Sequence, residues 1–308
     1  MPLQLAEVSI GSLSPPMVAM LAIVTFAYAR RARKLGPAGH VVPRWRQVCF
    51  YASVAVLVLE PLSPLGTSDE NSFLSHMLEH LVIGDLAALL MVLGITGPLI
   101  APLLKLDLIA KLRVLTHPLV ALPLWLLNLY VWHLPFMMEG AIGNDTVHVI
   151  QHLLFFGFGF NMWMPLFGPL PVPVWFNNVA KLLYIVVVRL AGVLLGNIFV
   201  FSGHVYYDSY VGADNIWGLG ALADQSIAGA VMMAESTFVS FALFAWLFVK
   251  AARESDASQD LIDLAAEHGV ELTGERSARA AAAGTTRLLR ERIVRSETDD
   301  RPPPGGET

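Results

Sequence analysis

The sequence predicts an all-α integral membrane protein with seven transmembrane helices, and three observations support this fold class. Hydrophobic residues make up 55% of the 308 residues, whereas a soluble globular domain contains about 45–50%. Charged residues make up only 15%, compared with about 25% in such domains, and the mean hydropathy is +0.59. Apolar runs long enough to cross a bilayer recur along the chain.

Seven apolar runs meet the requirement of about 20 residues per crossing. They cover residues 15–33, 48–66, 74–102, 114–134, 147–168, 179–202 and 221–250. The third and seventh runs are longer than one crossing requires, so we expect them to tilt or to project from the bilayer. In this scheme residues 1–14 are a short extracytoplasmic segment and residues 15–250 are the membrane domain.

The distribution of Lys and Arg predicts the orientation. Basic residues gather at the ends of the first, third and last runs and in the segments that follow them: Arg30, Arg31, Arg33, Lys34, Arg44, Arg46, Lys105, Lys111, Arg113, Lys250 and Arg253. The second, fourth and sixth loops (residues 61–71, 135–146 and 202–220) contain none. Because cytoplasmic loops of membrane proteins are enriched in Lys and Arg, we expect the N-terminus outside and the C-terminus in the cytoplasm.

Residues 251–308 differ in composition from the membrane domain. They are rich in Ala, Arg and Glu and end in a Pro- and Gly-rich stretch. The pattern allows two short amphipathic helices, near residues 261–267 and 286–295. Because the segment has too few apolar residues for a core of its own, we expect a mostly disordered cytoplasmic tail. The basic clusters lie next to the membrane, so they give no support for nucleic-acid binding.

Two pairs of histidines begin predicted helices. His76 and His80 begin the third run, and His148 and His152 begin the fifth. The i, i+4 spacing places both imidazoles of a pair on one face of a helix, one turn apart. Two imidazoles so placed can chelate one metal ion, or each can supply a ligand to a shared site.

Other candidate ligands reach the same outer depth. His133 and His204 end the fourth and sixth runs, Met77 lies inside the first histidine pair, and Asp224 begins the seventh run. A lone interfacial His, or an Asp at a helix start, is often only a cap. Ionisable residues within spans tend to mark function, however, and two pairs at equal depth favour a metal site. The candidate metal ligands are His76, His80, His148, His152, His133, Met77, Asp224 and His204.

The ligand types narrow the choice of metal. Imidazole suits zinc, copper, iron and nickel, whereas thioether sulfur favours Cu(I). Few carboxylates lie at this face, which argues against metals that prefer oxygen ligands. The sequence therefore predicts copper, as Cu(I), with zinc or haem as the alternatives.

Five further polar residues lie within the predicted spans. Asp85, Arg189 and Glu235 are near mid-membrane, where we expect Arg189 to form an ion pair with Glu235 or, alternatively, with Asp85. A proton relay is the functional alternative. Glu79 and Gln151 each precede the second histidine of a pair and point about 100° away from it. We expect these two to contact the ligands rather than the metal.

Four segments make the sequence resemble the CtaG family of caa-type cytochrome c oxidase assembly factors. They are Ser75–Leu81, Gly94–Leu99, His148–Phe155, and Asp224-Gln225 followed by Ala228-Gly229 and Met232. The resemblance extends over roughly residues 17–250.

The resemblance implies a multi-pass protein of the bacterial cell membrane that assists the formation of a haem–copper respiratory oxidase and is not itself an enzyme. It implies that His76, His80, His148 and His152 bind copper at the outer membrane face for delivery to the oxidase. The implied partners are the catalytic subunit of cytochrome c oxidase and a copper donor protein, in addition to the lipid bilayer.

Two other functions remain open from the residues. A haem-binding electron carrier needs one axial histidine from each of two facing helices, an arrangement that i, i+4 pairs do not favour. A zinc-dependent seven-helix hydrolase needs about three ligands and an open position. His76, His80, His152 and Asp224 could supply such a site, although no Gly-x-Ser-x-Gly motif accompanies them.

Overall fold

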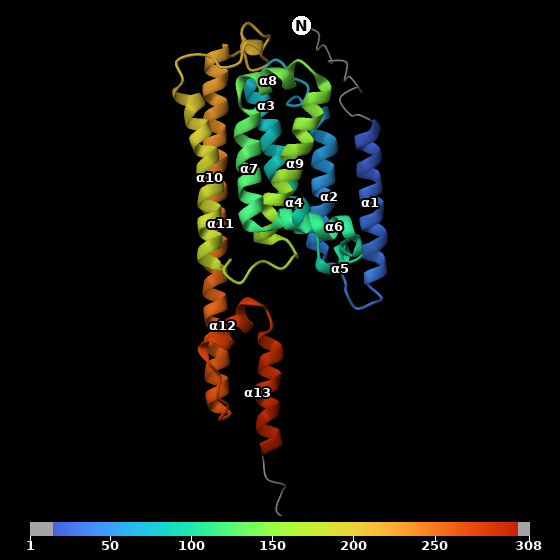
Figure 1. Cartoon of the computed structure of the whole chain (residues 1–308), viewed down its shortest axis with the longest axis vertical. Helices are drawn as coiled ribbons and strands as arrows, with labels where there is room; N and C mark the ends of the chain where they lie inside the picture. Colours follow the sequence, from blue (N-terminus) through green and yellow to red (C-terminus); the bar gives the residue numbers. More distant parts are fainter. Residues whose placement is uncertain (1–14, 301–308) are drawn as a thin grey trace, which may run out of the picture. The chain divides into compact units, whose positions relative to one another are not determined.

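A computed structural model describes residues 15–300 of the chain, and every regular element in this range is a helix (Figure 1). This confirms the all-α fold for that part of the chain. The expected extracytoplasmic segment, residues 1–14, lies outside the described residues, as do residues 301–308. The chain divides between Ser240 and Phe241 into two compact units, the N-terminal unit and the C-terminal unit.

The α-helices of the N-terminal unit are α1 (Pro15–Leu35), α2 (Arg44–Leu59), α3 (Phe73–Leu81), α4 (Ala88–Gly94), α5 (Gly97–Ile100), α6 (Asp107–Leu112), α7 (Pro118–Trp132), α8 (Pro135–Ile142), α9 (Asp145–Phe167), α10 (Asn178–Phe201) and the first part of α11 (Ala221–Glu267). Its 3-10 helices are η2 (Glu60–Leu62), η4 (Leu103–Lys105), η5 (Arg113–Thr116) and η6 (Asp208–Tyr210). A π-helix, η3 (Val82–Ala87), joins α3 to α4 without a break. The resulting α3–η3–α4 column packs against both α2 and α9.

Four helices are long and apolar enough to cross a membrane: Phe73–Gly94, Asp145–Phe167, Asn178–Phe201 and Ala221–Glu267. A fifth crossing is obtained if Asp107–Thr116 and Pro118–Trp132, which meet at a bend of 76°, act as one span. The other two predicted spans, residues 15–33 and 48–66, overlap α1 and α2. α2 has only 16 residues, fewer than the roughly 20 of a full crossing, so seven spans and their orientation stay predictions.

The third span ends earlier than its apolar run suggests. The helix stops at Gly94 because Ile95 and Thr96 are extended, and Pro98 lies in the first turn of the separate helix α5. Pro98 has no backbone N–H to donate to the carbonyl of Gly94, so α4 cannot continue through it, whereas the first turn of a new helix tolerates proline. The run of residues 74–102 is therefore one crossing followed by a short helix, and not one long tilted helix.

Glycines bring the helices of the two histidine pairs close together. A Cβ added to Gly159 of α9 would lie 2.0 Å from the carbonyl oxygen of Gly84 in η3. A similar contact joins α10 to α11, where a Cβ on Gly229 would lie 2.6 Å from the carbonyl oxygen of Gly196. Small residues allow such backbone approach between membrane helices. The α3–η3–α4 column and α9 are therefore held against each other just below their histidines.

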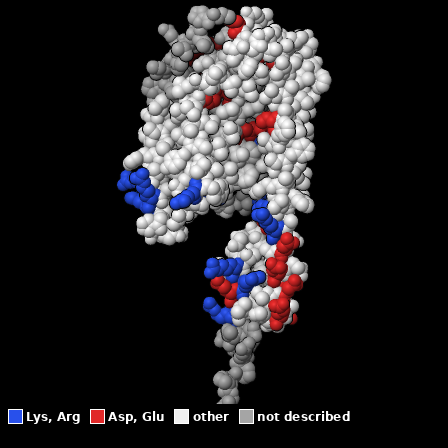
Figure 2. All heavy atoms as spheres, turned by 180° about the vertical axis from the view of Figure 1, so that it is seen from behind, with Lys and Arg blue, Asp and Glu red and all other residues white. Residues whose placement is uncertain are grey.

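Arginines lie around the opposite end of this column. Arg46 donates to the carbonyl oxygens of Leu93 and Ile95 at 3.0 and 2.8 Å, and Arg31 donates to that of Pro98 at 3.1 Å. On the face seen in Figure 2, the Lys and Arg side chains of the N-terminal unit lie at one end. The histidine pairs begin their helices at the other end of the column.

The C-terminal unit contains the second part of α11, α12 (Gly274–Ala282) and α13 (Thr286–Asp300). Leu261, Ala265, Ala280 and Ile293 form a buried apolar cluster between these helices. The structure thus differs from the mostly disordered tail expected for residues 251–308, as far as residue 300. Two alanines at the contact allow close packing, so a few large apolar side chains suffice for a small core.

Candidate metal centre

Asp224 of α11 fixes the start of α3. Its carboxylate accepts hydrogen bonds from the backbone N–H groups of Phe73 and Leu74 at 2.7 and 3.4 Å and from the hydroxyl of Ser72 at 3.0 Å. Negative charge at a helix N-terminus is stabilising. Both carboxylate oxygens of Asp224 accept hydrogen bonds at this helix start, and its role as a metal ligand stays a prediction. Asp224 positions the helix that carries His76 and His80.

Asn144 gives α9 a corresponding start. Its side-chain oxygen accepts from the backbone N–H groups of Thr146 and Val147 at 3.0 and 3.1 Å, the usual arrangement of a helix N-cap. The first turns that follow carry His148 and His152. The two helices thus present their histidines from the same end.

The structure brings these four predicted histidines together. The ring centres are 4.4 Å apart for His76 and His80, 5.2 Å for His76 and His148, 4.1 Å for His148 and His152, and 5.5 Å for His80 and His152. Two imidazoles that bind one ion at about 2 Å have ring centres at most about 6 Å apart. All four separations fall within this limit.

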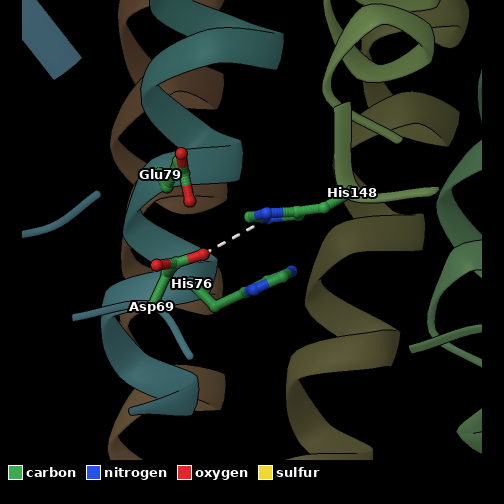
Figure 3. A group of neighbouring side chains, drawn as sticks. All are labelled: Asp69, His76, Glu79 and His148. Carbon is green, nitrogen blue, oxygen red and sulfur yellow. Dashed lines mark ion pairs between the residues drawn. The ribbon is translucent and has the colours of Figure 1, made fainter. Parts of the chain in front are cut away.

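Two carboxylates join the histidines. Ligand atoms of Asp69, His76, Glu79 and His148 all lie within 4.8 Å of one another (Figure 3). Asp69 Oδ2 lies 3.3 Å from His148 Nε2, and Glu79 Oε2 lies 3.5 Å from His152 Nε2. We call Asp69, His76, Glu79, His80, His148 and His152 the His–carboxylate cluster.

Sequence reasoning missed both carboxylates as members of the cluster. Glu79 is about 100° from His80 but only about 60° from His76, because three residues turn a helix by about 300°. Glu79 contacts His152, as expected, and its small angle to His76 also brings it into the cluster. Asp69 comes from the loop before α3. The available signal was an acidic pair, Asp69-Glu70, directly ahead of the first histidine in a loop without Lys or Arg.

Four residues of the His–carboxylate cluster are buried, whereas His148 and His152 are half-buried, and many polar atoms of the cluster lack a hydrogen-bond partner among the described residues. His76 and Glu79 are 1% and 2% exposed. Several ligand atoms have no hydrogen-bond partner among the described residues: both ring nitrogens of His76 and His80, Nε2 of His148 and His152, and Oε2 of Glu79. Each such atom costs about 1–3 kcal/mol when nothing satisfies it. Imidazole nitrogen with carboxylate oxygen is a donor set that suits Zn(II) or Cu(II), so these residues fit a metal ion.

Asp69 lies in the loop before the first span, and its environment is unusual for a carboxyl group. Burial, reinforced by the negative charge of Glu70, raises the pKa of Asp69 to about 7. Near neutral pH the group is therefore partly protonated. A cation bound there would displace this proton.

Met77 and His133, two further predicted ligands, lie together beside the cluster. Met77 Sδ is 3.3 Å from His133 Nε2, and His133 Nδ1 is 2.6 Å from the carbonyl oxygen of Leu129. The ring centre of His133 lies 6.4 Å from that of His80. These two residues are thus adjacent to the cluster through His80.

The structure does not bring His204 to the cluster. Its side chain is exposed and packs against Tyr206, with ring centres 4.5 Å apart. Its backbone carbonyl accepts from the side chain of Gln225 at 3.1 Å. Because α10 ends at Phe201, His204 belongs to the loop that follows, which Gln225 fixes to α11.

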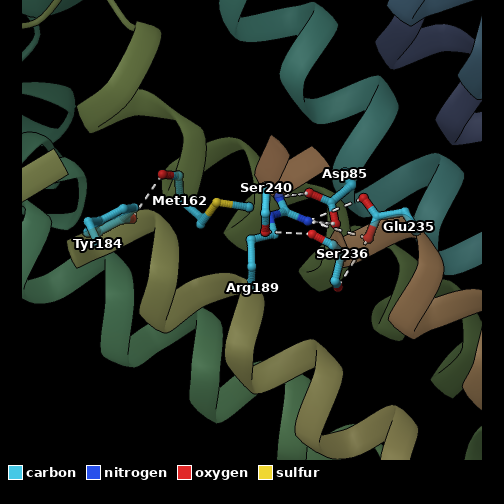
Figure 4. Close-up of polar contacts among 7 residues, drawn as sticks. All are labelled: Asp85, Met162, Tyr184, Arg189, Glu235, Ser236 and Ser240. Carbon is cyan, nitrogen blue, oxygen red and sulfur yellow. Dashed lines mark hydrogen bonds and ion pairs between the residues drawn. The ribbon is translucent and has the colours of Figure 1, made fainter. Parts of the chain in front are cut away.

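The three charged residues expected near mid-membrane, Asp85, Arg189 and Glu235, form a triad (Figure 4). Arg189 donates to Asp85 at 2.7 and 3.1 Å and to Glu235 at 3.2 Å, so both ion pairs considered as alternatives are present at once. The guanidinium also lies over the ring of Trp163, 4.9 Å from its centroid. A cavity of about 40 Å³ is lined by all three residues of the triad and also by His80.

Comparison with known proteins identifies one family. The profile of the family described as cytochrome c oxidase caa3 assembly factor (CtaG) matches residues 26–254 of the 308. No curated protein and no solved structure shows significant similarity to the chain.

Proposed function

The chain belongs to the family of cytochrome c oxidase caa3 assembly factors, and from this premise we propose that it binds copper in the His–carboxylate cluster and delivers it to the oxidase. The proposed partners are the catalytic subunit of the oxidase, which receives the ion, and a donor protein that supplies it. The proposed location is the bacterial plasma membrane. Binding and transfer of an ion require no catalytic step.

The observation that carries the proposal is a set of seven ligand atoms, on four histidines and Glu79, that have no hydrogen-bond partner among the described residues. They come from two helices that a contact between Gly84 and Gly159 holds together. A buried array with this many unsatisfied atoms would be costly to maintain unless a cation binds them. A bound cation would displace the protons of the Asp69 and Glu79 carboxyl groups, which would then supply negative charge to the ion.

The distribution of charge supports delivery at the outer face. The histidines lie at the helix ends joined by loops without Lys or Arg, whereas Arg31 and Arg46 lie at the other end of the α3–η3–α4 column. By the positive-inside rule, the end without basic residues faces away from the cytoplasm. An ion held there is within reach of extracytoplasmic proteins.

A haem fits this region poorly. The cavity that borders His80 has a volume of about 40 Å³, whereas pockets for organic cofactors commonly have about 300–1,000 Å³. The hydrolase alternative requires Asp224 as a ligand, whereas this carboxylate accepts hydrogen bonds from the start of α3. Zinc remains a competing ion for the cluster, and metal analysis distinguishes it from copper.

Metal analysis of the full-length protein, purified in mild detergent and loaded separately with Cu(I), Cu(II) and Zn(II), tests the proposal. The wild type should retain copper through desalting, and the double variant His80→Ala/His152→Ala should lose it. His204→Ala is the matched control, because this histidine is exposed and lies outside the cluster; it should retain wild-type copper.

A cellular assay links binding to assembly. In cells lacking the gene, wild type and His204→Ala should restore the copper content and activity of the oxidase, and the double variant should not. Full copper retention by a folded His80→Ala/His152→Ala protein would refute the proposed site. Retention of zinc but not copper would refute copper as the cargo.

A further inference from the structure

Beside the His–carboxylate cluster, two atoms that both normally accept hydrogen bonds face each other. His133 Nδ1 lies 2.6 Å from the carbonyl oxygen of Leu129. A carbonyl oxygen only accepts, so Nδ1 must carry the hydrogen, and a neutral imidazole then has its lone pair at Nε2. Nε2 points at Met77 Sδ, 3.3 Å away, and a thioether sulfur is also an acceptor.

This contact has the geometry of two ligands of one ion. A first-row metal binds imidazole nitrogen at about 2.0 Å and sulfur at about 2.3 Å, so ligand atoms 3.3 Å apart subtend an angle of about 100° at the ion. That angle is close to those of trigonal and tetrahedral coordination. Met77 is 1% and His133 8% exposed, so both atoms are withdrawn from solvent.

His80 supplies a third ligand. Both of its ring nitrogens lack a hydrogen-bond partner among the described residues, and its ring stacks on Phe155 with centres 4.2 Å apart. Its ring centre lies 6.4 Å from that of His133, slightly more than the roughly 6 Å allowed for two imidazoles on one ion, so the two rings must come closer together when they bind one ion. The same cavity of about 40 Å³ is lined by Met77, His80 and His133. That exceeds the roughly 10–15 Å³ that a water molecule needs.

The surroundings favour a singly charged, soft ion. The nearby lining is apolar, with Trp125, Leu129 and Phe155, and the carboxylates farther along it are bound to Arg189. Transfer of an ion into such a medium costs free energy that rises steeply with charge. Thioether sulfur, moreover, selects Cu(I) over Zn(II) and Cu(II).

We infer that Met77, His80 and His133 form a second metal site, the thioether site, which is selective for Cu(I). His80 belongs to both sites, with its ring 4.4 Å from His76 and 5.5 Å from His152. The His–carboxylate cluster has the oxygen ligands that divalent ions accept, and the thioether site has none. An ion can therefore stay bound to His80 while its other ligands change from those of one site to those of the other. Only Cu(I) is held at the thioether site. The inference rests on the proposed copper-binding function.

The variant Met77→Leu separates the two sites, because Leu preserves volume but removes the sulfur. Cu(I) affinity is measured in the full-length protein by competition with a colorimetric Cu(I) chelator, and Zn(II) binding is measured in parallel. Met77→Leu should weaken Cu(I) binding by at least about tenfold and leave Zn(II) binding unchanged. The reciprocal variant Asp69→Asn/Glu79→Gln should weaken Zn(II) binding and keep tight Cu(I) binding.

Met138→Leu is the matched control, since Met138 is 0% exposed and does not line the cavity. X-ray absorption of the Cu(I)-loaded protein should show sulfur scattering in the wild type and in Met138→Leu but not in Met77→Leu. Tight Cu(I) binding without sulfur scattering, unchanged by Met77→Leu, would overturn the thioether site and leave the proposed function intact. The Met77–His133 contact would then be a hydrogen bond that a protonated imidazole donates to the sulfur. A wild type that binds no copper would instead overturn the proposed function itself.

Discussion

At the scale of single residues, acidic side chains near the same helix start have different tasks. Asp224 is bound to backbone N–H groups and caps α3, whereas Glu79 has an oxygen without a hydrogen-bond partner among the described residues. Sequence position alone could not separate these roles. The capping function belongs to α3, about 150 residues before Asp224, and only the tertiary contact reveals it.

The cap gives a prediction for Asp224→Asn. The amide keeps one acceptor but loses the negative charge that the helix start favours, so we expect a loss of about 0.5–2 kcal/mol of stability. The change should appear as a lower Tm in detergent. Asp208→Asn, at an exposed position in η6, is the control and should leave Tm nearly unchanged. Equal Tm values for the two variants would contradict the capping role.

The triad gives a second prediction. Arg189→Met leaves Asp85 and Glu235 without their cation in a buried position, and breaking a buried ion pair in this way costs about 3–5 kcal/mol. Thermal unfolding in detergent should show a large drop in Tm. Arg279→Met provides the comparison, because its pair with Glu275 is at the surface, with side chains 72% and 82% exposed, where such pairs contribute about 0–1 kcal/mol. A small effect of Arg189→Met would mean that the triad is not a structural ion pair.

At the scale of helices, the sequence predicted which residues share a face but not which helices touch. The i, i+4 spacing correctly grouped His76 with His80 and His148 with His152, because helical periodicity is a local property. Their convergence depends on the approach of Gly84 and Gly159, and neither glycine stands out in the sequence. Asp69 lies on a loop, where no periodicity predicts the direction of a side chain.

The close contact between Gly84 and Gly159 can be tested by substitutions in α9. Gly159→Ala would place a Cβ 2.0 Å from the carbonyl oxygen of Gly84, so the helices must separate, whereas a Cβ on Gly157 meets nothing within 4 Å. We expect Gly159→Ala to destabilise the protein by about 1–3 kcal/mol and to reduce copper retention. Gly157→Ala should be neutral or stabilising by up to about 1 kcal/mol, because Ala favours the helix. Similar Tm values and copper contents for both variants would show that the close approach is not required.

At the scale of the whole molecule, the orientation rests on the positions of the basic residues. It can be measured with single cysteines in a Cys49→Ser background, since Cys49 is the only native cysteine. Val211 lies in a loop without Lys or Arg, Lys111 lies among the basic residues, and both are exposed. In intact cells, a membrane-impermeant maleimide should label Val211→Cys, and it should label Lys111→Cys only after permeabilisation. The reverse pattern would invert the predicted topology.

The cap on α3 also has a consequence for the order of events during synthesis. Asp224 follows Phe73 by 151 residues, which at about 5–20 residues per second corresponds to roughly 8–30 s of translation. A nascent chain stopped before α11 contains every residue of the His–carboxylate cluster but lacks the side chain that fixes the start of α3. The ribosome must therefore have synthesised the start of α11 before the cluster can take its final form, and we expect loading with metal to follow synthesis of Asp224.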